Sequence, residues 1–515
     1  MRTTLAALAV LALSAVACTL PDVQGGSNGN DRSTGGDQGE ELLTGAMVVS
    51  PDGKYALMQR NETSVLLDIQ AHTAREMPEQ AGRFLFAKSG SVGVAINQAG
   101  TELTAYDLTS LTSLWKARPA MAAGHVVALA KLSDDGKFLV LGDAGGVLVL
   151  DGATGERRGI AQVGSTPYEL SFVPGTDRAL VVGTTRWTDH KPLTDVIDVD
   201  LATLSVAHVD VPNCSAPVVV TPDAKRALLS PTFCEEDVAS NTKQTWTNPD
   251  PVSVIDLGAE GPVFRLNLPG FGPVAMDAEG SRAVAYLDME RIDPSMFPDA
   301  SKIPDKSGPR YHIMQIDPAS LAYTLTPVGD VLPRFAMTRD GSKLLVDATV
   351  TLVRGGVSVK ASIGSDGVSV SANLFGGSES LFGVFDLDQR VYAPITGPKA
   401  SLDRFVQMGD NAHVFGLTMT PDGLGGDLYR IDIDAHAVTA FGRSYRDIGL
   451  LPDGKSLLLR QRLPAGSTQA GGTISWFRRE SYCVSLDGIT CEWSLDFQDT
   501  KPFSTGTVCE GSHDC

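Results

Sequence analysis

Local signatures of metal or cofactor chemistry are missing from this 515-residue sequence. Its eight histidines are scattered and do not show the spacing that metal ligands have in known motifs. No His-Glu-x-x-His motif, dinucleotide-binding fingerprint or Cys-x-x-Cys pair occurs. We therefore expect no metal, no cofactor and no catalytic residues, and we expect that the protein is not an enzyme.

Basic residues are also in deficit. The chain has 42 Lys and Arg against 61 Asp and Glu, a formal net charge of −19. Such a surface repels phosphate backbones, so nucleic acid is not an expected partner. Aromatic residues are few, at 6%, but 43% of the residues are hydrophobic, which is enough for a large core and excludes a disordered chain. The 53 Gly and 29 Pro favour many short strands.

The N-terminus has the organisation of an export signal. Arg2 is followed by an apolar run from Leu5 to Leu13 and by small residues up to Cys18. The run is too short to span a bilayer comfortably. This segment resembles a bacterial lipoprotein signal, which implies cleavage after residue 17 and lipidation of Cys18. We expect an outer-membrane lipoprotein facing the periplasm or the cell surface, held in the membrane only by this lipid. Plain secretion or a free periplasmic protein is the alternative.

A polar tether and the cysteine count agree with export. Residues 24–41 are rich in Gly, Ser, Asn and Asp and contain no apolar residue, so residues 18–42 are predicted to be a lipidated flexible tether. Without Cys18, six cysteines remain, an even number suited to disulfides in an oxidising compartment. Local pairing is preferred among the 15 possible connectivities, with the last four open to exchange: Cys214–Cys234, Cys483–Cys491 and Cys509–Cys515.

A turn motif recurs along the chain between apolar runs. It reads SPDGK at residues 50–54, SDDGK at 133–137, and related strings at 221–225, 277–281, 338–342 and 451–455, with weaker versions near Ser89, Thr176 and Asp410. Pro, Asp and Gly in this order are typical of a tight turn between two strands. A second mark is an Asp that ends a later apolar run, and nine of these accompany the nine turns: Asp68, Asp107, Asp151, Asp198, Asp256, Asp317, Asp386, Asp432 and Asp487. Pairs of acids such as Asp198 and Asp200 are interpreted as turn caps rather than calcium ligands.

The spacing of these marks predicts the architecture. From each terminal Asp to the next turn the step varies only from 21 residues (Asp68 to Ser89) to 28 (Asp107 to Asp135). Within a unit it varies from 16 residues (Asp52 to Asp68) to 46 (Asp340 to Asp386). We therefore interpret each unit as four strands, A to D. Most of the length variation lies between strands B and C. Repeated four-stranded units of this size indicate a β-propeller.

The repeats resemble the TolB-type and YVTN-type propeller repeats of bacteria, which share the SPDGK turn. We expect an all-β fold with a single propeller of four-stranded blades over residues 43–498. About eight blades are expected, within a range of seven to nine, because nine units are counted. Residues 1–17 are the predicted signal peptide, and residues 499–515 form a cysteine-containing tail.

Long B–C loops make one rim the expected binding face. Predicted loops span residues 183–193, 234–251, 288–310, 353–380 and 462–472, and strict alternation around residues 364–367 predicts an added hairpin in the fourth. Loops on a rigid scaffold commonly carry binding sites, and exposed Trp and Arg commonly anchor interfaces. The candidate binding residues are Arg186, Trp187, Asp189, His190, Glu235, Glu236, Trp246, Glu290, Arg291 and Arg310.

Two functional hypotheses follow. The first is a monomeric, non-catalytic lipoprotein that binds an envelope protein or glycan through this rim. The alternative is a periplasmic propeller enzyme of lactonase or quinoprotein type, favoured only by Trp115, which resembles the Trp of quinoprotein repeats in a single unit.

Overall fold

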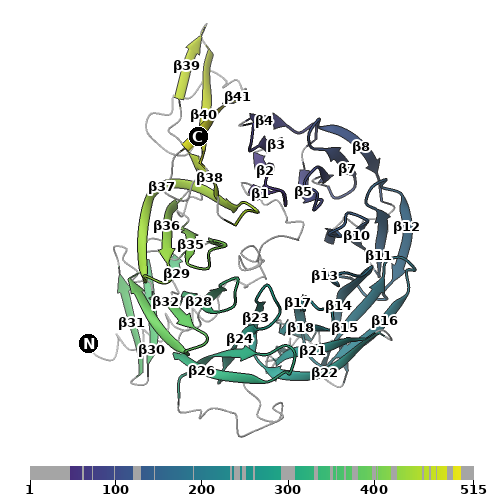
Figure 1. Cartoon of the computed structure of the whole chain (residues 1–515), viewed down its shortest axis with the longest axis vertical. Coiled ribbons are helices and arrows are strands. Elements are labelled where there is room, and N and C mark those ends of the chain that lie inside the picture. The colour runs from purple at the N-terminus through teal and green to yellow at the C-terminus, as the bar shows by residue number, and fades with distance from the viewer. Residues whose placement is uncertain are drawn as a thin grey trace.

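The protein is an all-β ring of blades (Figure 1). The structure, a computed structural model, describes residues 47–499 except 61–62, 72, 80, 98, 120–128, 144, 189–190, 232–234, 237–243, 246–250, 259–260, 291–307, 330–333, 348–351, 355–356, 365–366, 374–380, 397–401, 403, 419–425, 455–456, 463–465, 471–472 and 484–490. No helix occurs in these ranges. Eight four-stranded antiparallel blades are arranged as a β-propeller, as the sequence predicts.

The first four blades contain consecutive strands only. Their bounds are β1 (Met47–Val49), β2 (Tyr55–Arg60), β3 (Thr63–Asp68) and β4 (Thr73–Glu76); β5 (Ala81–Phe86), β6 (Val92–Asn97), β7 (Leu103–Asp107) and β8 (Thr112–Ala117); β9 (Leu129–Leu132), β10 (Phe138–Asp143), β11 (Gly146–Asp151) and β12 (Arg157–Gln162); and β13 (Glu169–Phe172), β14 (Arg178–Thr188), β15 (Lys191–Asp200) and β16 (Val206–Val211).

Blades 5 to 8 include two in which added strands interrupt the numbering. Their bounds are β17 (Ser215–Val220), β18 (Arg226–Pro231), β21 (Pro251–Gly258) and β22 (Gly261–Pro269); β23 (Phe271–Met276), β24 (Ala283–Asp288), β25 (Tyr311–Ile316) and β26 (Tyr323–Gly329); β27 (Arg334–Met337), β28 (Lys343–Asp347), β32 (Leu381–Asp386) and β33 (Val391–Thr396); and β34 (Arg404–Gln407), β35 (His413–Leu417), β36 (Gly426–Asp432) and β37 (Ala437–Leu450).

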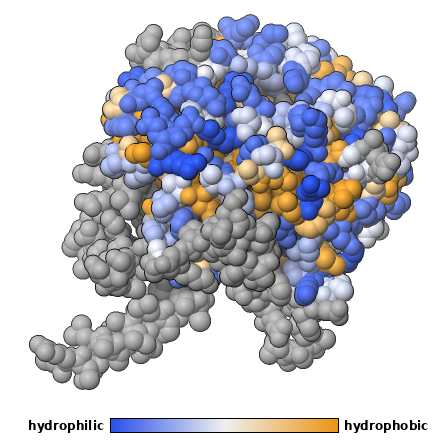
Figure 2. Space-filling model, turned by 60° about the horizontal axis from the view of Figure 1, so that its bottom comes forward, coloured by the Kyte–Doolittle hydropathy of each residue, from blue (hydrophilic) through white to orange (hydrophobic). Residues whose placement is uncertain are grey.

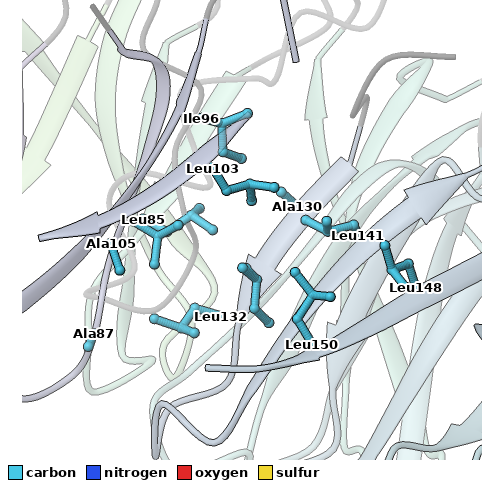
Figure 3. Close-up of a cluster of buried hydrophobic side chains, with 12 residues drawn as sticks. Leu85, Ala87, Ile96, Leu103, Ala105, Ala130, Leu132, Leu141, Leu148 and Leu150 are labelled. Atoms are coloured by element: carbon cyan, nitrogen blue, oxygen red, sulfur yellow. The ribbon is translucent and has the colours of Figure 1, made fainter. Parts of the chain in front are cut away.

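The core lies between blades. Strands B and C are apolar on successive residues because both of their faces are covered, and all six residues of β24 are buried. One cluster joins blades 2 and 3 through leucines such as Leu85, Leu141 and Leu148 (Figure 3). Equivalent clusters occupy the other junctions, so each sheet is sandwiched by its neighbours. Burial on both faces therefore holds the ring together.

The ninth repeat unit closes the ring. The second half of the long strand β37 pairs with β38 (Leu457–Arg462), and β38 continues to β40 (Thr473–Cys483) and β41 (Cys491–Asp499). Leu451 and Leu458 pack with Met58 and Leu67 of blade 1. The first blade contains only N-terminal strands, so the two ends of the ring meet by side-chain packing without exchanging a strand.

The predicted A–B turns are present with the chemistry that the motif implies. In blade 3, Ser133 Oγ accepts the Phe138 N–H at 2.9 Å and donates to Asp135 at 2.6 Å, while Gly136 takes a φ of 69°. Thr221 and Thr338 take the place of this serine in blades 5 and 7. The weaker motifs near Ser89, Thr176 and Asp410 also form turns.

The C–D turns confirm the structural reading of the acids, with one correction. Asp386 accepts the N–H groups of Asp388 and Gln389, and Asp432 caps its own turn in the same way. In blade 4 the cap is Asp200 and not Asp198, because β15 runs on to Asp200. The buried Asp198 instead accepts a hydrogen bond from Arg178 Nε at 3.0 Å.

Added strands fall between strands B and C, as the spacing predicts. They are β19 (Glu235–Glu236) and β20 (Gln244–Thr245) in blade 5, β29 (Leu352–Arg354), β30 (Val357–Gly364) and β31 (Gly367–Asn373) in blade 7, and β39 (Gly466–Ala470) before β40. Two predicted loops are instead largely strand. Residues 183–193 extend the β14–β15 hairpin, and residues 466–470 pair with β40, because cross-strand partners satisfy their backbone groups.

Candidate binding rim

The two rims of the ring differ in construction. The A–B and C–D turns hydrogen bond to each other, for example Ile69 N–H to Lys54 O at 2.8 Å and Leu387 N–H to Ser342 O at 2.9 Å. These turns therefore share one rim, called here the tight rim. The B–C connections leave the opposite ends of the same strands and form the elaborated rim, where the added strands lie and where β24 ends and β25 begins.

Polar side chains on the tight rim link neighbouring blades. Arg282 of blade 6 donates to Gly341 O at 2.7 Å and to Asp388 at 2.6 Å, both in blade 7. Lys343 of blade 7 makes an ion pair with Asp434 of blade 8. These groups stabilise the assembly of the ring.

The first group of candidate residues lies on the extended hairpin of blade 4. The register Arg186↔Leu193 and Trp187↔Pro192 carries the hairpin beyond the rest of the blade. Arg186 is exposed and makes an ion pair with Asp210 of β16, whereas Trp187 is half-buried. Asp189 and His190 lie outside the described residues.

Sequence reasoning missed a second pair of polar side chains on this blade. His208 Nδ1 of β16 lies 3.1 Å from both carboxylate oxygens of Asp195, which is buried on β15. Asp195 pairs with Asp210 and Ile197 with His208 in the register, so the pair is diagonal across two strands. Residues thirteen positions apart show this proximity only once the register is known.

Blade 6 brings three predicted loop residues together. The buried carboxylate of Asp288 accepts hydrogen bonds from Arg310 Nε at 2.9 Å and Nη2 at 2.8 Å. Arg310 Nη1 also lies 2.7 Å from exposed Glu290, and its guanidinium stacks over Tyr311 at 4.9 Å. Asp288 and Arg310 flank the long segment between β24 and β25, so this pair fixes its entry and exit. Arg291 lies outside the described residues.

The remaining candidates lie beside blade 5. Glu235 and Glu236 form β19, which pairs with β20 in a two-stranded ribbon. Trp246 is outside the part of the chain that the structure describes. The candidate residues that the structure describes thus belong to the same rim, on the consecutive blades 4, 5 and 6.

A buried histidine also lies toward this rim. His312 of β25 is 4% exposed, and its Nδ1 has no hydrogen-bond partner. Burial without a partner lowers its pKa below the ordinary value of 6.5. Its Cα partners are Leu287 and Pro327, close to the strand ends that carry Asp288 and Tyr311.

Two sequence features resemble parts of catalytic proteins, but each has a structural explanation in this fold. The Trp115 ring lies against Gly155 of the next blade, where an added Cβ would be 2.5 Å from Cε3. Residues 449–456 match the phosphate-loop consensus, a match that sequence reasoning missed, yet Gly449 belongs to β37, Leu451–Gly454 form a tight turn and β38 follows. A strand after this turn offers no helix N-terminus for a phosphate.

The register agrees with one predicted cysteine pair. Cys483 and Cys491 are direct Cα partners in the β40–β41 hairpin. Cys214 is buried immediately before β17, whereas Cys234, Cys509, Cys515 and Cys18 lie outside the described residues. The three disulfides remain predictions.

Within the ranges that the structure describes, no cluster of three His, Cys, Asp or Glu side chains could hold a metal ion. The same ranges contain no helix with the length and hydrophobicity of a membrane span. Hydrophilic residues cover much of the face in Figure 2, with hydrophobic residues gathered near its middle. The large hydrophobic residues that are exposed lie mainly on outer strands: Leu114 on β8, Val263 on β22, and Val391 and Tyr392 on β33.

Comparisons with known proteins yield distant likenesses. No known protein family matches the sequence, and no curated protein matches it. Among solved structures, a hydrazine synthase from Kuenenia stuttgartiensis shares 15% identity at a TM-score of 0.37, over 64% of this chain and 96% of the other. The β-propeller domain of Cps50 (Swd1) from Myceliophteria thermophila shares 8% at 0.35, over 65% and 97%. The dihydro-heme d1 dehydrogenase NirN shares 13% at 0.38, over 89% and 73%.

Proposed function

We propose that this protein is an exported, lipid-anchored β-propeller that binds a protein or glycan of the bacterial envelope through its elaborated rim, without catalysis. The observation that carries the proposal is the placement of the added strands on one rim, while the other rim is occupied by contacts between blades. A rigid ring with one elaborated rim is typical of a binding scaffold.

The sequence supports the cellular setting. The TolB-type and YVTN-type resemblance of the repeats, the export signal, Cys18 and the polar tether together favour a bacterial envelope lipoprotein. Mass spectrometry of the N-terminal peptide tests this part. A diacylated or triacylated Cys18 is expected, and an unmodified chain cleaved elsewhere would contradict it.

The binding proposal is tested by capture from envelope extract with rim-specific variants. We expect replacement of residues 291–307 by a short Gly-Ser connection to abolish partner capture, because Asp288 and Arg310 hold the two ends of this segment together. The matched control is Lys225→Glu on the tight rim, where the side chain is exposed. Capture that survives the loop replacement but fails with Lys225→Glu would place binding on the opposite rim.

A further inference from the structure

Tyr168 differs from the other exposed hydrophobic residues in its place in the ring. It is 39% exposed and directly precedes β13, the innermost strand of blade 4 (Figure 1). The other large hydrophobic side chains of high exposure in the described ranges lie on outer strands. Because β13 leads into an A–B turn on the tight rim, its first residue lies at the elaborated rim, and Tyr168 lies there with it. An aromatic ring is thus accessible at the inner edge of this rim.

The hydroxyl of Tyr168 is held in place. Burial raises the pKa of Tyr168 above its ordinary value of 10.0, and a hydrogen bond with Thr185 of β14 opposes part of this rise. Thr185 Oγ1 lies 3.0 Å from Thr194 Oγ1, and Thr194 donates to the Asn213 carbonyl oxygen at 2.6 Å. Since a carbonyl oxygen accepts and does not donate, Thr194 accepts in turn from Thr185. The buried hydroxyl therefore restricts the orientation of the ring and contributes little to the exposed area of the residue.

Polar groups lie beside the ring without adding net charge. Lys131 of blade 3 donates to Leu170 O, and its Nζ lies 3.4 Å from Glu169 Oε1, so the two charges are paired next to Tyr168. Both side chains are partly accessible, at 13% for Lys131 and 26% for Glu169. Thr166, two residues before Tyr168, is exposed. An ammonium, a carboxylate and a hydroxyl together offer hydrogen-bond donors and acceptors to a neutral ligand.

The elaborated rim has a step beside Tyr168. Phe138 and Arg178 occupy equivalent places after their A–B turns, because the carbonyl of each accepts a hydrogen bond from the residue five positions earlier. From these residues, β10 of blade 3 runs for six residues and β14 of blade 4 runs for eleven. The blade 4 hairpin therefore extends about 16 Å further than its neighbour. Thr185, which holds the Tyr168 hydroxyl, lies in this extension, so the hairpin rises beside the ring.

A lone accessible ring suits a sugar better than a protein. A stable protein interface takes roughly 800 Å² from each partner and has an apolar core rich in aromatic residues. In the described ranges, no second large hydrophobic residue is exposed at the inner edge of the elaborated rim. A sugar ring, in contrast, has a face of C–H groups whose hydrogens carry partial positive charge, and the negative face of an aromatic ring attracts them. Its hydroxyls require polar neighbours, which Lys131, Glu169 and Thr166 supply.

We propose that Tyr168 is the stacking platform of a glycan-binding site, on which one uncharged sugar ring lies. Lys131 and Glu169 bind hydroxyls of that sugar, and the blade 4 hairpin limits the directions in which the rest of the glycan extends. This inference rests on the proposed function, because it uses the same rim and narrows the partner to a glycan. Fixing the ring in advance lowers the entropy that is lost on binding.

Saturation-transfer NMR tests the site. The probes are soluble oligosaccharides of glucose, galactose, mannose and N-acetylglucosamine, each added separately to the purified full chain. We expect at least one of them to bind, and titration gives its dissociation constant. Tyr168→Ala should weaken this binding about tenfold or more, because ring stacking is lost. Tyr168→Phe keeps the ring and should stay within about threefold of the unaltered chain.

A matched tyrosine and a second variant of the site serve as controls. Tyr392 is 41% exposed but lies on β33, an outer strand of blade 7, so Tyr392→Ala should bind sugar like the unaltered chain. Glu169→Gln leaves the ring intact and should weaken binding about fivefold, which provides a test even if Tyr168→Ala fails to fold. Melting temperatures report the folding of each variant. The proposal is overturned if none of the sugars binds, or if neither Tyr168→Ala nor Glu169→Gln weakens binding more than Tyr392→Ala does.

Partner capture from envelope extract separates this inference from the proposed function. Capture should fail after periodate oxidation of the extract, which cleaves sugar rings between adjacent hydroxyl-bearing carbons. Capture that survives oxidation but is lost with Tyr168→Ala would assign this surface to a protein and overturn the glycan site. Capture that survives both changes and still requires residues 291–307 would overturn this inference alone and leave the proposed function in place.

Discussion

The tight rim and the elaborated rim are built from the same strands but use their polar residues differently. On the tight rim, turn residues bond to their own blade or to the next one, as with Ser133 and Arg282. On the elaborated rim, the ionic pairs of Arg186 and Arg310 remain within a single blade, at the base of an extension or insertion. The first arrangement closes a ring, and the second holds variable segments in place. Length variation is therefore tolerated on one rim and excluded from the other.

The largest expected effect comes from breaking the pair that anchors the blade 6 segment. Arg310→Met removes the guanidinium that donates two hydrogen bonds to the buried Asp288 carboxylate. Loss of one member of a buried pair costs about 3–5 kcal/mol of unfolding free energy. Urea denaturation measures this loss of unfolding free energy. Arg186→Met, at the exposed pair with Asp210, is the matched control and should cost less than about 1 kcal/mol. Equal losses in the two variants would contradict the distinction between buried and exposed anchors.

The next largest effect tests the closure of the ring on the tight rim. Gly53 has a φ of 70°, and an added Cβ would lie 2.8 Å from Pro452 Cδ of the last unit. Gly53→Val should lower the unfolding free energy by about 2–4 kcal/mol through backbone strain and this clash.

Gly136→Val provides the control for that variant, because Gly136 has a φ of 69° with no neighbour within 4 Å. It reports the strain alone, about 1–3 kcal/mol. If Gly53→Val cost no more than Gly136→Val in urea denaturation, the first and last units would not be in contact as described.

A smaller effect is expected from a single turn. Ser133→Ala removes the acceptor of the buried Phe138 N–H and should cost about 1–2 kcal/mol by thermal or chemical denaturation. Ser133→Thr should retain the stability, since Thr221 makes the same contact in blade 5. A destabilised threonine variant would show that the hydroxyl is not the important group.

The smallest effect is a pH response near the elaborated rim. His312 has a lowered pKa in the fold, so the unfolded chain binds more protons below about pH 6.5. Its contribution to stability is complete above that pH and declines as the pH falls. Between pH 7 and pH 5, the melting temperature of the His312→Leu variant should therefore fall less than that of the unaltered chain. The difference between the two falls should be on the order of 1 °C. An identical pH dependence in the two proteins would contradict the buried neutral state of His312.

The turns of the tight rim respond in a different range. Hydrogen bonding by the Ser320 hydroxyl lowers the pKa of Asp317, and the Ser110 N–H does the same for Asp107. These contributions are complete above about pH 3.8, the ordinary value, and are lost only as the pH falls through the lower folded values. Acidification to pH 5 should consequently leave the tight rim unaffected.

The sequence predicted the fold well because turn chemistry is local. The Pro-Asp-Gly motifs and their spacing determine where strands A and B meet, and the structure has its turns there. The site was predicted less completely. The pairing of His208 with Asp195 depends on the register of two long strands, and the extension of β14 and β15 through residues 183–193 depends on cross-strand partners. Neither this pairing nor this extension can be predicted from residues that are adjacent in the sequence.

Site-specific crosslinking compares the two rims most directly. A photo-crosslinking residue at position 186 or 290 on the elaborated rim, or at position 54 or 225 on the tight rim, reports which rim faces a partner in intact envelopes. All four native side chains are exposed. We predict specific adducts from positions 186 and 290 and none from 54 and 225. Adducts arising from the tight-rim positions, with none from 186 and 290, would contradict the assignment of binding to the elaborated rim.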